Sequence, residues 1–302
     1  MLRWKSGRVA LLHLFFEILS HDDIIFQKTY SRYHKWAMKW AKLLGKRCYL
    51  DIDDAPSRIN ATKTLKNFRE MLVLADGVFA GSNNLVEYCK PYQINTWLIP
   101  SSIYLKHYLV DSFSNDKICL CWIGNGKYYK QDLIGVLLEP LKQIAAKHPV
   151  RLKLIGACGE KELYQAFSGI KGLEIDFIDT IEWSSPAAVS KAMQNVDIGL
   201  YPLISNDFNY YKCGFKALEY MAIGIPVVSS SVAINIDIIG HGKDGYLVDS
   251  TDEWIAALND LICNAAKRQE MGDAGRKKVE QYYSVDKTAS LIGSLITCGA
   301  RG

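Results

Sequence analysis

The sequence contains no CxxC pair, although eight cysteines are spread over its 302 residues. The nearest two, Cys119 and Cys121, are separated by a single residue inside an apolar run. Zinc sites and redox dithiols need paired cysteines at suitable spacing, so both fit this chain poorly. We expect reduced, buried thiols in a cytoplasmic protein.

The sequence also lacks a strong charge imbalance and a membrane-length apolar run. Its net charge is +4, which is too small for a nucleic-acid-binding surface but suits anionic small molecules or an anionic membrane face. His13 and Glu17 interrupt the apolar stretch 9–19, and no small-residue cleavage site follows it. The stretch is too short to span a bilayer, so we expect an amphipathic helix in a core or on a membrane surface.

No internal repeat or low-complexity tract is present; short β-rich runs alternate with helix-length segments instead. The runs lie at 23–28, 47–51, 77–81, 96–100, 118–124, 151–156, 173–178, 196–202, 226–229 and 246–248. Strands that are bounded by turn residues and separated by helices indicate parallel sheets with right-handed crossovers.

The polar stretch 111–117 predicts a linker between two Rossmann-like α/β domains, at 1–110 and 111–284. The segment 285–302 predicts a C-terminal helix that packs on either domain, including back on the first. Ligands of such sheets lie at the carboxyl ends of strands, hence in a cleft between the domains. The N-terminal domain has four strand candidates where a complete half has about six, so we expect it to be incomplete.

The segment 209–230, NYYKCGFKALEYMAIGIPVVSS, predicts a site for a phosphate group. Gly214 opens a helix that Gly224 ends. A helix that opens with glycine leaves free backbone N–H groups at its positive end, and Lys212 and Lys216 flank that end.

Glu219 stands on the same helix, beside an apolar stripe made by Phe215, Leu218 and Ala222. Its carboxylate could accept both hydroxyls of a ribose while a diphosphate rests at the helix start. The alternative is a half-exposed helix with solvated charges and no chemistry, because short motifs recur by chance.

This segment resembles the signature of glycosyltransferase family 4, in which E-x7-E runs into a helix that reads roughly E-G-F-G-x4-E-A-M-A-x-G-x-P-V-V. The matching residues are Gly214, Glu219, Met221, Ala222, Gly224, Pro226, Val227 and Val228. The stretch 118–124 followed by Lys130 resembles the family's V-G-R-x4-K element, and Asn235 with 241–248 resembles its next segment. The resemblance covers about 110–285 well and about 20–110 more loosely, and it implies the two-domain GT-B fold.

The resemblance implies roles for particular residues. Glu219 would bind the donor ribose, and the backbone at Gly214 and Phe215 would approach the donor sugar and phosphates. Lys130, placed after Gly124, would neutralise the leaving diphosphate, so that no metal ion or other cofactor is needed.

The chain departs from the family pattern at two positions. Tyr211 replaces the first Glu, which removes the usual contact to a sugar hydroxyl. Asn125 replaces the Arg of V-G-R, which removes a phosphate charge. The run 212–216, KCGFK, resembles a branch of these enzymes with G-K-C-G-x-K, and there Lys212 would bind the donor.

An acidic cluster, 51–54 (DIDD), ends the second predicted strand. Asp53 and Asp54 occupy the approximate place of a family His-Asp pair and are candidate catalytic residues that touch a sugar. A D-x-D metal clasp and simple helix capping are the alternatives.

The resemblance implies transfer of a sugar from a UDP- or GDP-linked donor to a glycan or lipid-linked acceptor, in cell-surface polysaccharide synthesis and with retained configuration. The aromatic and basic run 30–40 could touch lipid headgroups on the inner face of the membrane. The alternatives are an epimerase, for which no convincing acid–base set is present, and an inactive protein that binds nucleotide sugars or serves as a partner subunit. The departures at Tyr211 and Asn125 motivate the inactive alternative.

Overall fold

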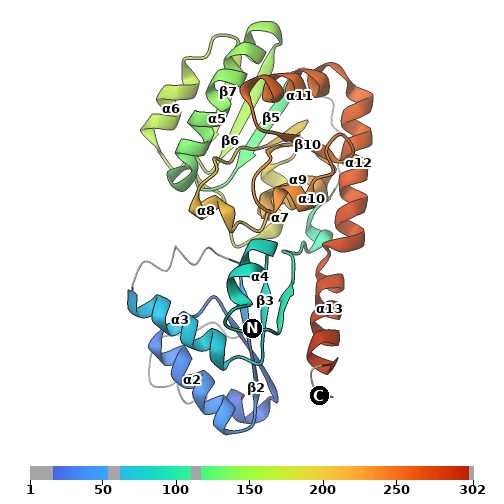
Figure 1. The fold of residues 1–302 in the computed structure, drawn as a ribbon. Coiled ribbons are helices and arrows are strands. Elements are labelled where there is room, and N and C mark those ends of the chain that lie inside the picture. Colours follow the sequence, from blue (N-terminus) through green and yellow to red (C-terminus); the bar gives the residue numbers. More distant parts are fainter. Residues whose placement is uncertain (1–15, 54–61, 110–116, 299–302) are drawn as a thin grey trace. The chain divides into compact units, whose positions relative to one another are not determined.

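The computed structural model describes residues 16–53, 62–109 and 117–298 (Figure 1). The expected linker at 111–117 falls almost wholly outside these ranges, as does Asp54. Of the apolar stretch 9–19, only 16–19 is described, and it is helical. Within the described ranges, no helix is long and apolar enough to cross a membrane.

The chain forms two compact units. Unit 1 comprises 1–100, 211–213 and 292–302, and unit 2 comprises 101–210 and 214–291. Tyr108 therefore belongs to unit 2, whereas the short segment Tyr211–Cys213 makes its contacts within unit 1.

Unit 1 is built on a parallel sheet of four strands in the order β1-β2-β3-β4. Its elements are β1 (Asp23–Gln27), α2 (Arg32–Leu43), β2 (Arg47–Ile52), α3 (Thr62–Leu74), β3 (Gly77–Ala80), α4 (Asn83–Cys89) and β4 (Thr96–Leu98). Ser82 caps α4, because its hydroxyl accepts a hydrogen bond from the N–H of Leu85.

Unit 2 is built on a parallel sheet of six strands in the order β10-β9-β8-β5-β6-β7. The strands are β5 (Ile118–Ile123), β6 (Val150–Ile155), β7 (Leu173–Ile178), β8 (Ile198–Tyr201), β9 (Val227–Ser230) and β10 (Gly245–Val248). Read in chain order from β5, this is the doubly wound order 3-2-1-4-5-6. The direction of winding reverses between β5 and β8, which are hydrogen-bonded neighbours.

The helical elements of unit 2 are η2 (Leu105–His107), α5 (Gly126–Lys147), α6 (Lys161–Ser168), α7 (Pro186–Ala192), α8 (Asp207–Tyr210), α9 (Phe215–Ile223), α10 (Asn235–Ile238), α11 (Thr251–Cys263) and α12 (Ala265–Tyr282). Helix α5 packs against α6 and α11, and α9 lies between strands β8 and β9 and helix α12. Cys119 to Ile123 of β5 are all buried, as expected for a strand whose sheet is covered on both faces.

The last helix, α13 (Val285–Cys298), is divided between the two units: its residues up to Leu291 belong to unit 2, and those from Ile292 onward belong to unit 1. In unit 1, its residues Ile292, Leu295 and Ile296 pack against a small core of Tyr49, Phe79 and Ile99. The expected fold class of two Rossmann-like parallel-sheet domains, with a shorter first sheet, is confirmed.

Candidate donor site

The point where the sheet of unit 2 reverses its winding brings several of the predicted donor residues together. Gly124 and Asn125 follow β5, and α5 begins at the next residue. The chain that follows β8 leads to Gly214 and α9. In open α/β sheets, ligands bind outside the carboxyl ends of the two strands at such a switch point.

Helix α9 begins at Gly214, whose φ of 67° lies in the left-handed region that glycine adopts readily. A Cβ at this position would lie 2.2 Å from Cδ1 of Ile238, so the backbone also passes close to α10. Among the residues that the structure describes, no side chain caps this helix start. Its first N–H groups therefore remain available to an anion.

A buried amide lies beside this helix start. Asn235 is fully buried, and its Nδ2 donates to the hydroxyl of Ser229 at 2.8 Å. Its Oδ1 has no hydrogen-bond partner among the described residues and lies 3.6 Å from the Cβ position of Gly214. A buried acceptor without a partner is unusual in a folded protein.

Lys216 brings a positive charge from α9 to the turn after β5. Its Cε lies 2.6 Å from the position that a Cβ on Gly124 would occupy, so glycine is required where the lysine passes. Its ammonium lies 4.2 Å from the centre of the Tyr129 ring and 5.6 Å from that of Tyr201. The two rings hold the cation by cation–π attraction without neutralising it.

Tyr220 fastens α9 to the central strand. Its hydroxyl donates to the carbonyl oxygen of Cys121 at 3.0 Å and accepts from the N–H of Ile123 at 3.1 Å. Its ring lies over Gly199 of β8, where a Cβ would come within 2.5 Å of it. The helix that carries Lys216 and Glu219 is therefore fixed to both strands of the switch point.

Glu219 is the buried carboxyl group of this site, with 7% of its surface exposed. Burial raises its pKa to about 7, while the hydroxyl of Tyr108 and the charge of Lys216 lower it and so oppose part of that rise. A carboxyl group with such a perturbed pKa at the carboxyl ends of parallel strands is a functional-site candidate on physical grounds. The half-exposed helix with solvated charges is not what the structure shows, because Ala217 to Ile223 are all buried.

The sequence profile of the glycosyl transferases group 1 family matches residues 117–264. This stretch is a glycosyl transferases group 1 domain. Spore coat protein SA of Bacillus subtilis is 23% identical to the chain over 169 residues, which cover 53% of the chain and 44% of that protein. The capsular polysaccharide glycosyltransferase CapM of Staphylococcus aureus is 23% identical over 179 residues, which cover 56% of the chain and 43% of that protein. The match thus spans less than half of each of these relatives.

Solved structures share the fold of the whole chain. Sucrose-phosphate synthase from Thermosynechococcus elongatus matches 95% of the chain and 75% of its own length, with a TM-score of 0.71 and 16% identity. HepE from Anabaena, solved in complex with UDP and glucose, matches 97% of the chain and 83% of its own length, with a TM-score of 0.70 and 16% identity. At this identity the likeness concerns the fold alone.

Asn125 and Lys130 are two predicted donor residues of the group 1 domain whose contacts differ from those of Gly214, Lys216 and Glu219. Asn125 is exposed at the start of α5, and its Oδ1 lies 3.7 Å from the thiol of Cys158. Lys130 forms ion pairs with Glu162 at 2.5 Å and Glu160 at 3.5 Å, which raise the pKa of its ammonium. Lys216, which is also a predicted donor residue, passes close to Gly124.

Tyr211 and Lys212 belong to unit 1, whereas Gly214 belongs to unit 2. The Tyr211 ring packs edge-on against Tyr88, with centroids 6.1 Å apart. Lys212 is half-buried. The thiol of the adjacent Cys213 donates to the carbonyl oxygen of Asp53 at 3.2 Å.

Asp51 and Asp53, the described acidic residues at the end of β2, both have partners within unit 1. Asp53 forms an ion pair with Lys28, and its Oδ1 is buried without a hydrogen-bond partner among the described residues. Asp51 accepts from Gln27 at 2.8 Å, and burial raises the pKa of its carboxyl group. Within the described ranges, no group of three His, Cys, Asp or Glu side chains could hold a metal ion.

Sequence reasoning missed the residues that support the site. Tyr108 bonds to Glu219 from 111 positions away, and Arg276 binds the backbone of Tyr108 from 168 positions away. Neither residue stands in a motif, so no local signal could have found them. Asp132 was also missed; it accepts from the N–H of Ile204 and the amide of Asn209 and fixes the loop that precedes α9.

Proposed function

We propose that the protein is a glycosyltransferase that moves a sugar from a UDP- or GDP-linked donor to a glycan or a lipid-linked acceptor in cell-surface polysaccharide synthesis. One observation carries the proposal. An uncapped helix start, a lysine held over aromatic rings and a buried carboxyl group occupy the switch point of a doubly wound sheet.

The arrangement suits each part of a nucleotide-sugar donor. The diphosphate would lie at the N–H groups of α9, with Lys216 beside it. Glu219 follows Gly214 by five residues, about 7.5 Å along the helix axis, and would bind the ribose hydroxyls. The spacing fits a nucleoside diphosphate laid along the first turns of α9.

The chemistry follows from the charge that develops as the donor breaks. When the bond between the sugar and the β-phosphate breaks, negative charge grows on the leaving diphosphate. Lys216 and the α9 N–H groups are already oriented, so they stabilise this charge without rearrangement. A metal ion is then not needed, and we propose metal-independent transfer with retained anomeric configuration, as in the family that the signature resembles.

Asp53 and Asp54 remain our candidates for contact with the reacting or accepting sugar. Asp53 supports this role because one oxygen of its carboxylate is buried with no hydrogen-bond partner among the described residues, while Lys28 pairs with the other. Lys28 has a φ of 49°, an uncommon conformation for a residue with a side chain. Such backbone conformations concentrate at functional sites.

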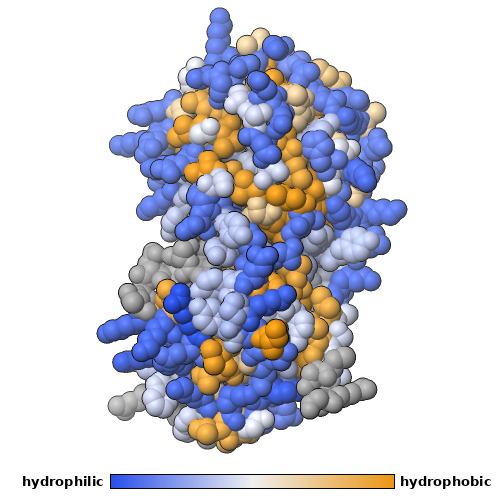
Figure 2. Space-filling view, in the orientation of Figure 1, coloured by the Kyte–Doolittle hydropathy of each residue, from blue (hydrophilic) through white to orange (hydrophobic). Residues whose placement is uncertain are grey.

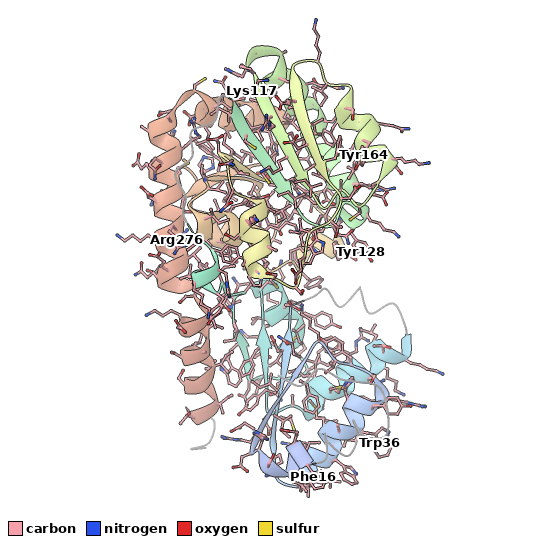
Figure 3. The ribbon with its side chains drawn as sticks, turned by 180° about the vertical axis from the view of Figure 1, so that it is seen from behind. Phe16, Trp36, Lys117, Tyr128, Tyr164 and Arg276 are labelled. Carbon is pink, nitrogen blue, oxygen red and sulfur yellow. The ribbon has the colours of Figure 1, made fainter. Side chains whose placement is uncertain are left out.

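The exposed face of α2 supports a peripheral contact with the inner face of an anionic membrane. Tyr33, Trp36, Trp40 and Leu43 lie on one face of the helix and are each at least half exposed. Figure 3 shows Trp36 on α2, and Figure 2 shows apolar surface among the hydrophilic residues of unit 1. The helix has no acidic residue, and Arg32 and Lys39 flank the aromatic face. Aromatic rings with basic neighbours suit the headgroup region of an anionic bilayer.

Product formation tests the proposal. The protein is incubated with a panel of UDP- and GDP-sugars in EDTA, and release of UDP or GDP is followed with membrane extracts as acceptor source. We expect release from one donor, abolished in Lys216→Met and retained in Lys243→Met, which changes an exposed lysine on a turn. NMR of the product's anomeric proton reports the configuration. Release that requires manganese would contradict the metal-independent mechanism, and donor binding without any release would favour an inactive protein.

Sedimentation with lipid vesicles tests the membrane contact separately. We expect binding to vesicles with phosphatidylglycerol, little binding to pure phosphatidylcholine, and loss in Trp36→Ala/Trp40→Ala. Trp183→Ala removes an exposed tryptophan of unit 2 and is the matched control. Equal sedimentation of all three proteins would rule out α2 as the contact.

A further inference from the structure

Glu219 is held in place by a tyrosine from outside its own helix. The hydroxyl of Tyr108 donates to Oε1 of Glu219 at 2.9 Å. Only 3% of Tyr108 and 7% of Glu219 are exposed, so the bond is shielded from water. In such surroundings a hydrogen bond to a charged group is among the stronger ones in a protein.

Tyr108 is itself anchored to the same helix through its backbone. Arg276 of α12, labelled in Figure 3, donates to the carbonyl oxygen of Tyr108 at 2.7 Å and also to that of Ala222, near the end of α9. The ring of Tyr108 is part of the main hydrophobic core of unit 2. Both ends of this residue are therefore tied to α9, one directly and one through Arg276.

The bond to Tyr108 uses one carboxylate oxygen and leaves the other. Oε2 of Glu219 accepts no hydrogen bond from the described residues. A carboxylate oxygen has two lone-pair positions, which is enough for the two hydroxyls of a ribose.

We propose that Tyr108 is a positioning residue for donor binding: it fixes Oε1 of Glu219 so that Oε2 faces the ribose hydroxyls of the nucleotide. This inference rests on the proposed function, since it assigns the partner of the free oxygen. The holding bond also favours the ionised carboxylate, which is the form that accepts two hydroxyls.

The opposite role would be a plug, in which Tyr108 occupies the carboxylate until the donor displaces it. Displacement would expose a ring that is now buried in the core and would break its alignment with Arg276. Exposing an aromatic side chain is strongly unfavourable, and a ribose offers no compensating apolar surface. The anchoring therefore favours a support over a plug.

The Tyr108→Phe variant separates the two roles. Phe keeps the ring and loses the hydroxyl, so the pKa of Glu219, now about 7, should rise further. If it rises by about one unit, the ionised fraction at neutral pH falls roughly fivefold, and affinity for UDP or GDP should fall by at least that factor. The midpoint of the pH–affinity profile should move upward by the same amount. Among the described residues, the charged or titratable groups around Glu219 are Tyr108, Lys216 and Tyr220 of α9 and, at the Tyr108 backbone, Arg276.

The experiment measures affinity for UDP and GDP by calorimetry across the pH range for the wild type, Tyr108→Phe and Tyr104→Phe. Tyr104 is an exposed tyrosine at the start of η2 and is the matched control. Titration of the nucleotide's own phosphate contributes equally to the pH–affinity profiles of all three proteins, so it cancels when the profiles are compared. A double-mutant cycle of Tyr108→Phe with Glu219→Gln, read by urea unfolding at acid and alkaline pH, detects the pair without any nucleotide.

We expect weaker binding and a raised midpoint in Tyr108→Phe alone, with a coupling in the cycle that grows with pH. Tighter binding in Tyr108→Phe would show a plug and overturn the proposal. Unchanged binding with a pH-dependent coupling would show a purely structural pair and would also overturn it. If the wild type binds neither nucleotide, the proposed function fails and this role fails with it, while the cycle still reports whether the pair forms.

Discussion

Replacing Glu219 with Gln should make unit 2 more stable at alkaline pH while it removes most of the affinity for nucleoside diphosphates. The carboxyl group is almost fully buried, and burial raises its pKa from 4.5 to about 7. A group whose folded pKa is raised binds more protons in the folded than in the unfolded chain between these two values. The free energy of unfolding therefore falls as the pH rises through this window, and the full penalty is present above the folded pKa.

The size of the penalty follows from the shift. The difference between about 7 and 4.5 is about 2.5 pKa units, which at 1.36 kcal/mol per unit amounts to about 3 kcal/mol. Gln cannot ionise, so the stability of the variant relative to the wild type should increase by about this amount between acid and alkaline pH. Any change in the bond to Tyr108 that does not depend on ionisation alters this stability difference by the same amount at every pH.

Urea unfolding at about pH 5 and about pH 8.5 measures most of this difference. Glu270→Gln replaces an exposed glutamate of α12 and is the matched control. In parallel, affinity of Glu219→Gln for UDP or GDP should fall roughly tenfold to a hundredfold, because a charged acceptor for the ribose is lost. A stability difference that stays constant with pH would show that Glu219 is not a buried ionisable group of the kind described, and the reasoning would be refuted.

Three further predictions concern residues that are predicted to bind the donor. Lys216→Met should weaken binding of UDP or GDP roughly tenfold to a hundredfold but leave nucleosides unaffected, because only the diphosphate loses its cation; equal losses for both would contradict the assignment. Gly214→Ala should destabilise the protein by about 1–3 kcal/mol in urea unfolding, through a left-handed φ and contact with Ile238. Gly242 has a φ of 76°, and a Cβ added there would meet no heavy atom within 4 Å, so Gly242→Ala measures the backbone contribution alone. Equal losses of stability in Gly214→Ala and Gly242→Ala would exclude a contribution from the contact with Ile238. Lys212→Ala should lose turnover far more than stability, and unchanged turnover at saturating donor would exclude a donor role.

Much of the fold was predictable because parallel strands leave strong local signals. The runs at 47–51 and 173–178 became β2 and β7 almost to the residue, since each is a β-rich run bounded by turn residues. Gly224 ends α9 in the left-handed conformation, as expected of a helix-ending glycine.

The surroundings of α9 were less predictable. The periodicity assigned Phe215 to an apolar stripe, but Phe215 is 45% exposed and Ala217 to Ile223 are buried. The helix lies between the sheet and α12, so tertiary packing overrides a pattern meant for a surface helix. The contacts of Glu219 with Tyr108, and of Lys130 with Glu162, join separate elements and leave no trace in local sequence.

The central claim, that unit 2 binds the nucleotide of a sugar donor, is tested most directly by thermal stabilisation with UDP, GDP and ADP in the presence of EDTA. We expect a rise in melting temperature with UDP or GDP that is absent in Glu219→Gln and Lys216→Met and retained in Glu270→Gln and Lys243→Met. No rise with any of the three nucleotides in the wild type, or an equal rise in all five proteins, would contradict it.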